Sequence, residues 1–138
     1  MPKKKNRIII DTNLWISFLL THNFDNLDRI FADKSVMILF SKALLDEFIE
    51  VAQRPKFKKY FSLADLEALL LQVKNEAKFI NVKSATKLCR DAKDDFLLSL
   101  AKDGNATHLV TGDKDLLDIN FFGITKITTI ENYLLHER

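Results

Sequence analysis

Hydrophobic residues occur along the chain in two patterns, as short unbroken runs and as longer stretches with a helical period. The short β-branched run at 7–10 predicts a strand. The run at 36–40 shows no alternation of apolar and polar positions, so it predicts a strand that is buried on both faces. Further strands are predicted at 79–82, 107–111 and 126–129. Helical spacing predicts helices over 14–20, 24–32, 41–52, 62–78, 91–102 and 130–136, with one helical turn at 115–119.

Local signals mark the ends of several of these elements. Ser41 is a favourable N-cap residue, Pro55 interrupts a helical pattern, and Gly104 ends another. Strands that alternate with helices indicate an α/β domain in which a mainly parallel sheet lies between helical layers. We expect residues 1–138 to form a single domain, with a basic and flexible leader at 1–6.

The composition agrees with a globular domain and excludes several classes of protein. Hydrophobic residues make up 47% of the 138 residues and charged residues 29%, which is enough apolar surface for a core and too much for a disordered chain. The one cysteine, Cys89, excludes an internal disulfide and a zinc site with several cysteines, and it agrees with a reducing compartment. No apolar run reaches the ~18–20 residues of a membrane span. We therefore expect a cytoplasmic protein.

Acidic residues stand at the ends of two predicted strands. Asp11 directly follows the first strand, and Asp113 lies just beyond the strand at 107–111. Because the carboxyl ends of parallel strands meet at one edge of a sheet, both side chains are predicted at the same edge, where α/β proteins gather their functional groups. Asp94 and Asp95 open the helix that precedes the second of these strands. Each of these acids also has a purely structural explanation, since aspartate caps helices.

A glutamate in the helix at 41–52 is a further candidate. Glu47 flanks the apolar stripe of this helix on one side and Asp46 flanks it on the other, so amphipathicity does not choose between them. Several carboxylates that converged on one sheet edge would repel one another unless a cation neutralised them. Oxygen ligands without a His or Cys cluster favour Mg²⁺ or Mn²⁺ over zinc.

The net charge of +2 is too close to zero to indicate a nucleic-acid partner, so the distribution of charge has to carry that argument. The segment 54–61 interleaves cations with aromatic rings, a composition that suits phosphate contact and base stacking. Its cations are Arg54, Lys56, Lys58 and Lys59, and its rings are Phe57, Tyr60 and Phe61. The alternative is a solvated loop whose rings turn toward the core.

Four motifs in order resemble the PIN-domain nucleases. They are Asp11-Thr12-Asn13 after a β-branched run, an acidic helix after the second strand, Lys93-Asp94-Asp95-Phe96-Leu97-Leu98, and Thr111-Gly112-Asp113-Lys114-Asp115. The resemblance extends from Ile8 to about Leu134 and is closest to the group described as toxin components of toxin–antitoxin systems. It implies a PIN-like three-layer α/β/α sandwich with a central, mainly parallel sheet.

The resemblance also implies an activity and a set of site residues. The activity is cleavage of RNA by a Mg²⁺- or Mn²⁺-dependent endoribonuclease. Eleven phenylalanines indicate spare apolar surface, so we also expect a homodimer or higher homo-oligomer, or a docking site for a cognate antitoxin protein. The implied metal and catalytic residues are Asp11, Glu47, Asp95 and Asp113, and the implied supporting residues are Thr12, Asn13, Asp94, Thr111 and Asp115. Glu47 is thereby favoured over Asp46. The third acid, at Asp95, could shift by one residue to Asp94.

Other classes remain to be weighed against a nuclease. A phosphatase with an aspartate nucleophile needs a second Asp where this chain has Asn13, and a receiver domain needs adjacent acids near its first strand. The chain has three glycines and no phosphate-binding glycine loop, which argues against a nucleoside-triphosphate enzyme. A catalytically degenerate PIN-like module that binds RNA or a protein without cutting is the alternative that stays open.

Overall fold

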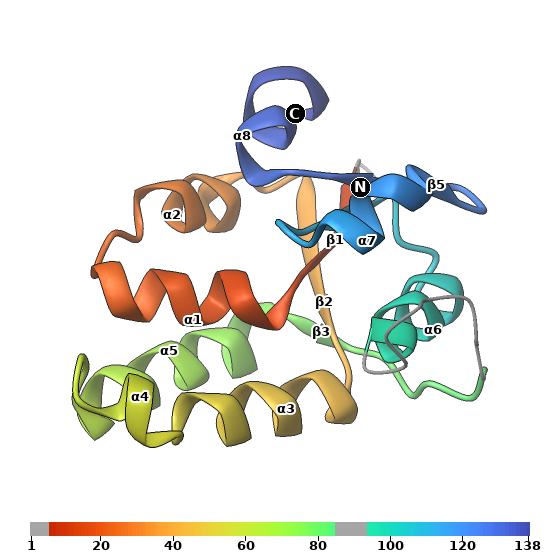
Figure 1. Ribbon diagram of the computed structural model, residues 1–138. Coiled ribbons are helices and arrows are strands. Elements are labelled where there is room, and N and C mark those ends of the chain that lie inside the picture. Colours follow the sequence, from red (N-terminus) through yellow and green to blue (C-terminus); the bar gives the residue numbers. More distant parts are fainter. Residues whose placement is uncertain (1–5, 85–93) are drawn as a thin grey trace.

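A central sheet with helices on both sides organises the computed structural model, which describes residues 6–84 and 94–138 (Figure 1). The strands are β1 (Asn6–Ile10), β2 (Val36–Phe40), β3 (Lys78–Phe79), β4 (His108–Val110), β5 (Phe121–Phe122) and β6 (Thr125–Thr128). The helices are α1 (Thr12–Thr21), α2 (Asp25–Ala32), α3 (Lys42–Ala52), α4 (Pro55–Lys58), α5 (Leu63–Glu76), α6 (Asp95–Asp103), α7 (Lys114–Ile119) and α8 (Ile130–Asn132), and a π-helical turn, η2 (Tyr133–Glu137), follows α8. The predicted three-layer α/β fold is confirmed.

The strand order places the start of the chain in the middle of the sheet. The six strands run in the order β3-β2-β1-β4-β6-β5, and all neighbours are parallel except the antiparallel pair β5 and β6. Since β1 has β2 on one side and β4 on the other, the strand order reverses between β1 and β4. A crevice outside the carboxyl ends of these two strands is where open α/β sheets bind their ligands.

The inner strands β1 and β2 are buried on both faces, as the unbroken apolar run at 36–40 predicted for β2. Ile8, Ile9 and Ile10 of β1 have no exposed surface, and Leu39 and Phe40 of β2 have none either. On the α1 side of the sheet, Trp15 is the centre of an aromatic cluster. Its ring lies 5.4 Å from that of Phe40, 6.0 Å from Phe18, 6.1 Å from Phe48 and 6.5 Å from Phe31, measured between centroids. This packing fixes α1 and α3 against the sheet.

The C-terminal segment crosses back to the amino ends of the strands. Tyr133 is fully buried, and the amide of Asn6 donates a 3.0 Å hydrogen bond to its hydroxyl. Glu137 lies 2.9 Å from His108 Nε2 and 3.3 Å from Lys126 Nζ. The hydrogen bond with His108, with help from Lys126, lowers the pKa of Glu137. The end of the chain is thereby held at the edge of the sheet opposite the carboxyl ends.

Most predicted elements are present, with differences at their ends. The strand predicted to begin at Arg7 begins at Asn6, which is buried, so only residues 1–5 of the predicted leader lie outside the described chain. The helix predicted over 62–78 ends at Glu76, because Ala77 is extended and leads into β3. The helix predicted over 91–102 is observed as α6, and residues 91–93, like Cys89, lie outside the described residues.

Two short elements were not predicted. α4 is a single turn that begins at Pro55, whose fixed φ and missing N–H suit a first helical position, so the proline that interrupts α3 also starts a new helix. β5 pairs with β6 in a hairpin whose loop begins at Gly123, where φ is +60°, as a two-residue turn of type II′ requires. Within the described residues, none of the helices has both the length and the apolar character to cross a membrane.

Gly104 follows α6 as predicted, although for a different reason from the usual one. Its φ of −88° is not left-handed, so the helix end does not require glycine for its backbone conformation. A Cβ at this position would instead lie 2.9 Å from the carbonyl oxygen of Leu100 and 2.9 Å from Leu39 Cδ1. Glycine is needed here because α6 approaches the sheet closely.

We predict that Gly104→Ala lowers the free energy of unfolding by ~1–3 kcal/mol, the usual cost of forcing a methyl group into a packed site. Gly112→Ala is the matched control, because nothing lies within 4 Å of a Cβ there. The control should change stability by less than about 1 kcal/mol. Urea unfolding of the two variants and the wild type measures both values, and equal stabilities for the two variants would contradict the packing argument.

Candidate active site

Asp11 occupies the corner where β1 ends and α1 begins. Its backbone continues the sheet, since its N–H donates a 3.0 Å hydrogen bond to the carbonyl of Val110 in β4. Its side chain caps α1 by accepting from the Asn13 N–H at 3.4 Å, and its second carboxylate oxygen accepts from the Thr111 hydroxyl at 2.6 Å. The residue is 5% exposed. A carboxylate is thus buried at the place where the carboxyl ends of β1 and β4 meet.

Burial raises the pKa of Asp11 above its ordinary value of 3.8, and the nearby charge of Asp113 adds to this rise. The hydrogen bonds from Thr111 and Asn13 act in the opposite direction, because they favour the charged form. The net direction shows that these hydrogen bonds do not fully compensate for the lost solvation. A positive charge in the crevice would therefore be stabilising.

Thr111 connects Asp11 to the second strand-end acid. The Thr111 side chain is fully buried, and while its hydroxyl donates to Asp11 it accepts a 3.0 Å hydrogen bond from the N–H of Asp113. Asp113 caps α7 in turn, and its side chain accepts from the N–H of Asp115 at 2.9 Å. The prediction that the ends of β1 and β4 bring these residues to one edge is confirmed by this chain of hydrogen bonds.

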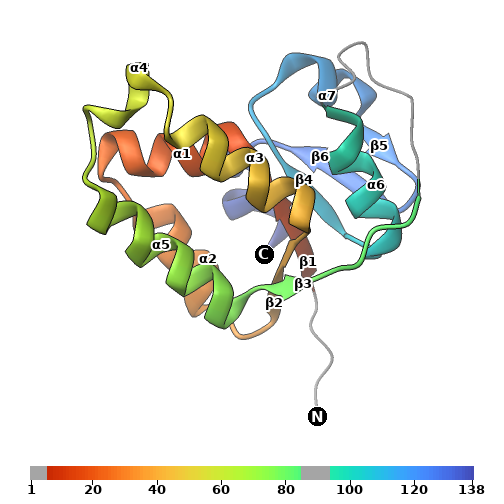
Figure 2. The same ribbon diagram turned by 90° about the horizontal axis from the view of Figure 1, so that it is seen from below.

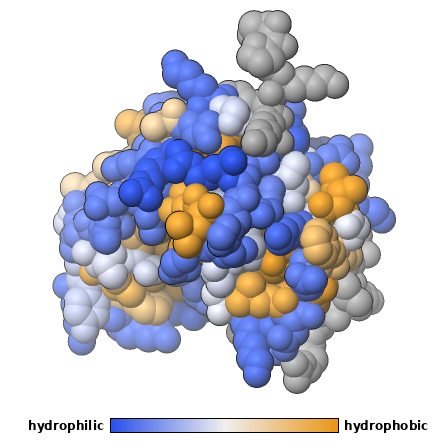
Figure 3. Space-filling view, turned by 90° about the horizontal axis from the view of Figure 1, so that it is seen from above, coloured by the Kyte–Doolittle hydropathy of each residue, from blue (hydrophilic) through white to orange (hydrophobic). Residues whose placement is uncertain are grey.

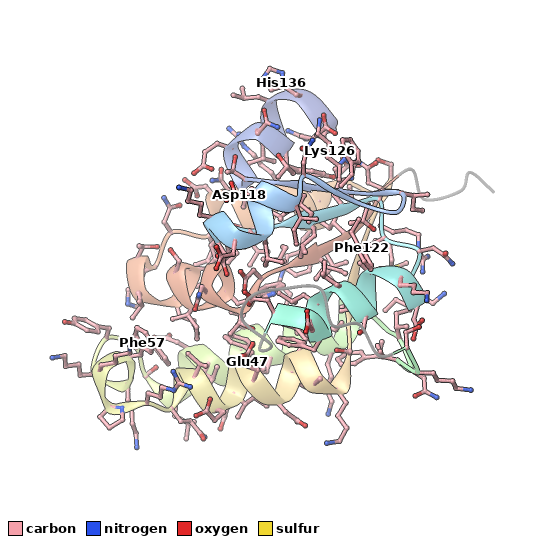
Figure 4. All side chains as sticks on the ribbon, turned by 45° about the vertical axis from the view of Figure 1, so that its right-hand side comes forward. Glu47, Phe57, Asp118, Phe122, Lys126 and His136 are labelled. Atoms are coloured by element: carbon pink, nitrogen blue, oxygen red, sulfur yellow. The ribbon has the colours of Figure 1, made fainter. Side chains whose placement is uncertain are left out.

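Glu47 joins the same group from α3. The Thr12 hydroxyl donates a 2.6 Å hydrogen bond to Glu47 Oε2, and Thr12 is 4% exposed. Figure 4 labels Glu47 on the ribbon of α3, on the side that faces the interior of the molecule. Asp46, its neighbour, is exposed and forms a 2.8 Å ion pair with Lys42. Of the two acids between which amphipathicity did not choose, only Glu47 is tied to the segment that carries Asp11.

Trp15 is a positioning residue that the sequence alone did not single out. Its indole N–H donates a 2.9 Å hydrogen bond to the carbonyl of Ile10, the residue directly before Asp11. The same ring packs on Phe48, the residue directly after Glu47. One buried side chain therefore fixes the backbone beside both acids. The available signal was a single tryptophan four residues after a strand-end aspartate.

The third predicted acid stands at the start of α6. Asp94 is the N-cap residue of α6 and makes no capping hydrogen bond through its side chain, and Asp95 is the first residue of the helix. Both are partly buried, and α6 packs against α3. Across residues 6–84 and 94–138, no three His, Cys, Asp or Glu side chains are grouped as they would be around a metal ion. Hydrogen bonds of Thr111 and Thr12 connect three of the four predicted acids, Asp11, Asp113 and Glu47, to the ends of β1 and β4.

The basic segment lies at the other end of α1. Its cations are exposed, Arg54 pairs with Glu50 at 2.9 Å, and Lys56 Nζ lies 4.9 Å from the centre of the Phe57 ring. The carbonyl of Tyr60 lies 3.1 Å from Nε2 of His22, the residue that ends α1. Since α1 has 10 residues, this segment is separated from Asp11 by ~15 Å of helix. The basic segment therefore does not contact the acids and lies at the opposite end of α1 from Asp11.

Two comparisons relate the chain to known proteins. A family model described as PIN domain matches residues 7–115, a range that contains Asp11, Glu47, Asp95 and Asp113. The chain is also 32% identical over 123 residues to an uncharacterized protein of Methanocaldococcus jannaschii, and the match covers 86% of this chain and 78% of that protein. The family match begins in β1 and ends in α7, so it includes the carboxyl ends of both β1 and β4.

We predict that Asp11→Asn becomes more stable relative to wild type as the pH rises from below 4 toward neutrality. The pKa of Asp11 is raised in the folded state, so the folded protein holds this proton more tightly than the unfolded chain. Wild-type stability is therefore lost as the pH rises through 3.8 and then through the raised value. Asparagine does not titrate.

Unfolding in urea over this pH range measures the difference between the two proteins. Any hydrogen bond that asparagine fails to make shifts the difference by a constant amount and leaves its pH dependence unchanged. A difference that stays flat with pH would show that burial does not perturb this carboxylate. A difference that moves the other way would show that the charged form is stabilised in the folded protein.

Proposed function

Because the chain belongs to the PIN-domain nuclease family, we propose that it is a metal-dependent endoribonuclease that hydrolyses RNA at the crevice between β1 and β4. The observation that carries this proposal is the buried carboxylate of Asp11, joined through Thr111 to Asp113. Glu47, tied to Thr12, and Asp95, at the start of α6, complete the proposed set. The cofactor is Mg²⁺ or Mn²⁺.

The donors in the crevice fit such an ion. They are oxygen atoms, and Mg²⁺ is commonly held by one or two protein carboxylates with water and substrate phosphate as its other ligands. Asp11 and Asp113 supply two such carboxylates, so a site of this kind does not require three acids in close contact. A cation would favour the charged form of Asp11 and so would oppose the rise in its pKa that burial causes. When bound, the ion would supply positive charge to the scissile phosphate and to an attacking water.

Hydrogen bonds within the protein would orient the carboxylates toward the ion and the substrate. Thr111 holds one oxygen of Asp11 by its hydroxyl, which leaves the other oxygen, only weakly engaged with Asn13 at 3.4 Å, to face a ligand. Thr12 orients Glu47 in the same way. Asp113 is fixed by the turn into α7. A carboxylate of this group that accepts a proton from the attacking water would serve as the general base, and we assign that role to the set rather than to one member.

An acidic crevice repels RNA, so we propose that the basic segment around α4 contributes the opposing charge. The separation of ~15 Å along α1 implies that one RNA strand would have to extend over several nucleotides to contact both places. The exposed cations and the partly exposed Phe57 suit a single strand with stacked bases. This arrangement would make cleavage more efficient on longer single strands than on di- or trinucleotides.

The biological role follows from the group of PIN-domain proteins that the motifs resemble. We propose that the chain is the toxin component of a toxin–antitoxin system in the cytoplasm, inhibited by a cognate antitoxin protein. A degenerate module that binds RNA without cutting it is the competing proposal. The four acids present in the sequence favour the nuclease, since a binding module has no need of them.

We predict that the purified protein cleaves a mixed RNA pool with Mn²⁺ or Mg²⁺ and does not cleave it with EDTA. Removing residues that only orient metal ligands costs ~10–100-fold in activity. Thr12→Val, which removes the hydrogen bond to Glu47, should therefore lower the cleavage rate by ~10–100-fold. Asp11→Asn should lower it by more than about 100-fold. Rates come from single-turnover cleavage of a labelled RNA.

Asp118→Asn is the matched control, because Asp118 is an exposed acid of α7, labelled in Figure 4, and no part of the proposed set. Its rate should equal that of the wild type. Metal-dependent melting temperatures provide a second readout, since Mg²⁺ should raise the melting temperature of wild type more than that of Asp11→Asn. RNA binding without cleavage under every metal condition would favour the degenerate module instead.

We predict that replacing Lys56, Lys58 and Lys59 together with glutamine weakens RNA binding and flattens its salt dependence. Each lost phosphate contact on a single strand lowers the slope of log K against log salt by ~0.7, so the slope should fall by up to ~2. A triple variant at Lys78, Lys83 and Lys102 removes the same charge from exposed positions elsewhere and should leave the slope unchanged. If both triple variants showed the same salt dependence of RNA binding, the proposal that the cations around α4 contact the RNA would be contradicted.

A further inference from the structure

A hollow of about 660 Å³ lies beyond the carboxyl ends of β2 and β3, beside the start of α3. Its lining residues include Ser41, which directly follows β2, and Ile80, which directly follows β3. Figure 2 shows the start of α3 and the segment that leaves β3 in the same part of the molecule. Because β1, β2 and β3 are parallel neighbours, the hollow lies at the same edge of the sheet as Asp11.

Two features place this hollow next to the proposed active site. Neighbouring strands are ~4.8 Å apart, so the ends of β2 and β3 lie ~5–10 Å from the end of β1. Ala43 lines the hollow, is exposed, and stands four residues before Glu47. Residues at this spacing share one face of a helix and lie ~6 Å apart along it. The hollow is therefore about one helical turn from an acid of the proposed set.

An exposed aromatic ring borders the hollow. Phe79 is 42% exposed, and its ring centroid lies 5.8 Å from that of the buried Phe40, which fixes the ring against the sheet. Exposure of one apolar residue is ordinary, and the face around α8 also shows separate hydrophobic patches (Figure 3). Phe79 differs because it borders a hollow whose volume falls within the ~300–1,000 Å³ of small-molecule sites. A flat ring of a ligand could therefore lie against Phe79.

The polar lining of the hollow supplies partners for the edge of such a ring. Lys42 donates a 2.8 Å hydrogen bond to Asp46, and both side chains are exposed. Asn81 adds an amide, which both donates and accepts. Since Lys42 and Asp46 together carry no net charge, the hollow repels a phosphate less than the group of carboxylates does. Proteins recognise unpaired bases by stacking them on aromatic rings and bonding to their edges, and the hollow offers both kinds of contact.

We propose that this hollow is a subsite for one unpaired nucleobase of the RNA substrate, in which the base stacks on Phe79 and its polar edge meets Asp46 and Asn81. The inference rests on the proposed function, because it takes RNA as the ligand. α3 would then lie along the bound strand, with the hollow at its start, Glu47 in its middle and the basic segment after its end. The strand would be held on both sides of the acids, and its backbone would thereby be positioned across them.

Binding of a labelled single-stranded RNA in EDTA, where the proposed nuclease is inactive, tests the subsite. Loss of one base–aromatic stack weakens binding ~5–100-fold, so Phe79→Ala should bind more weakly than wild type by a factor in this range. Phe121→Ala is the matched control, because Phe121 is 54% exposed in a two-residue strand at the opposite edge of the sheet. Its affinity should equal that of wild type.

Two further variants keep the test independent of the packing between Phe79 and Phe40. Ala43→Leu fills part of the hollow from α3 and should weaken binding by at least about 5-fold, whereas Ala68→Leu, at an exposed position of α5, should not change it. Phe79→Trp keeps a stacking surface and adds a reporter, so RNA should quench its fluorescence. Wild type, whose one tryptophan is the buried Trp15, should show no such quenching.

Circular dichroism verifies that each variant is folded. Equal affinities for wild type, Phe79→Ala and Ala43→Leu overturn the inference, and so does RNA that leaves the fluorescence of Phe79→Trp unchanged. A wild type that binds no RNA overturns it as well. Cleavage with metal is measured separately. Binding that depends on Phe79 without any cleavage supports the subsite and contradicts the proposed nuclease, whereas cleavage with binding that is indifferent to Phe79 and Ala43 does the reverse.

Discussion

Burial of the Asp11 carboxylate is the constraint on which the site depends. The carboxyl ends of β1 and β4 meet where the strand order reverses, and the chain places a negative charge there with 5% of its residue surface exposed. Such a charge is costly unless it is compensated, and the surroundings compensate it only in part. The Thr111 hydroxyl and the Asn13 amide favour the charged form, while burial and Asp113 disfavour it. A cation at this topological switch point would supply the missing compensation, which is why the proposed function places the metal ion there.

Several buried side chains keep that carboxylate in place. Trp15 bonds to the carbonyl before Asp11 and packs on the residue after Glu47, so α1, α3 and the end of β1 are held by one ring. Thr111 has no exposed surface and uses its hydroxyl both as donor and as acceptor. On the far side of the sheet the Asp103 carboxylate accepts hydrogen bonds from the hydroxyl and N–H of Ser84 and from the N–H of Lys83, which lowers the pKa of Asp103 to about 2. Asp103 is the last residue of α6, so these hydrogen bonds hold the far end of the helix that begins at Asp95.

The sequence alone predicts those parts of the site that depend on topology. Asp11 and Asp113 could be placed at one edge because they follow strands of a parallel sheet, and that inference needs no side-chain contact. Glu47 could not be chosen over Asp46, because the two acids flank equally the apolar stripe formed by Leu44, Leu45, Phe48, Ile49 and Ala52. In the structure the buried face consists of Leu44, Phe48, Val51 and Ala52, which turns Glu47 inward and Asp46 outward. The choice depends on how α3 rotates against its neighbours. β5 was missed for a different reason, since a strand of two residues is too short to show a period.

That rotation of α3 also separates the proposed site from the groove between α3 and α5. Successive residues of a helix are ~100° apart, so Glu47 points almost opposite to Leu45 and Ile49. One flank of α3 therefore faces Thr12 and the crevice, while the other lines the groove against α5. Leu45 packs against the core as well as lining this groove, so it belongs to the contact between α3 and α5. The rotation that places Leu45 and Ile49 beside α5 is thus the same one that leaves Glu47 to accept the hydrogen bond from Thr12.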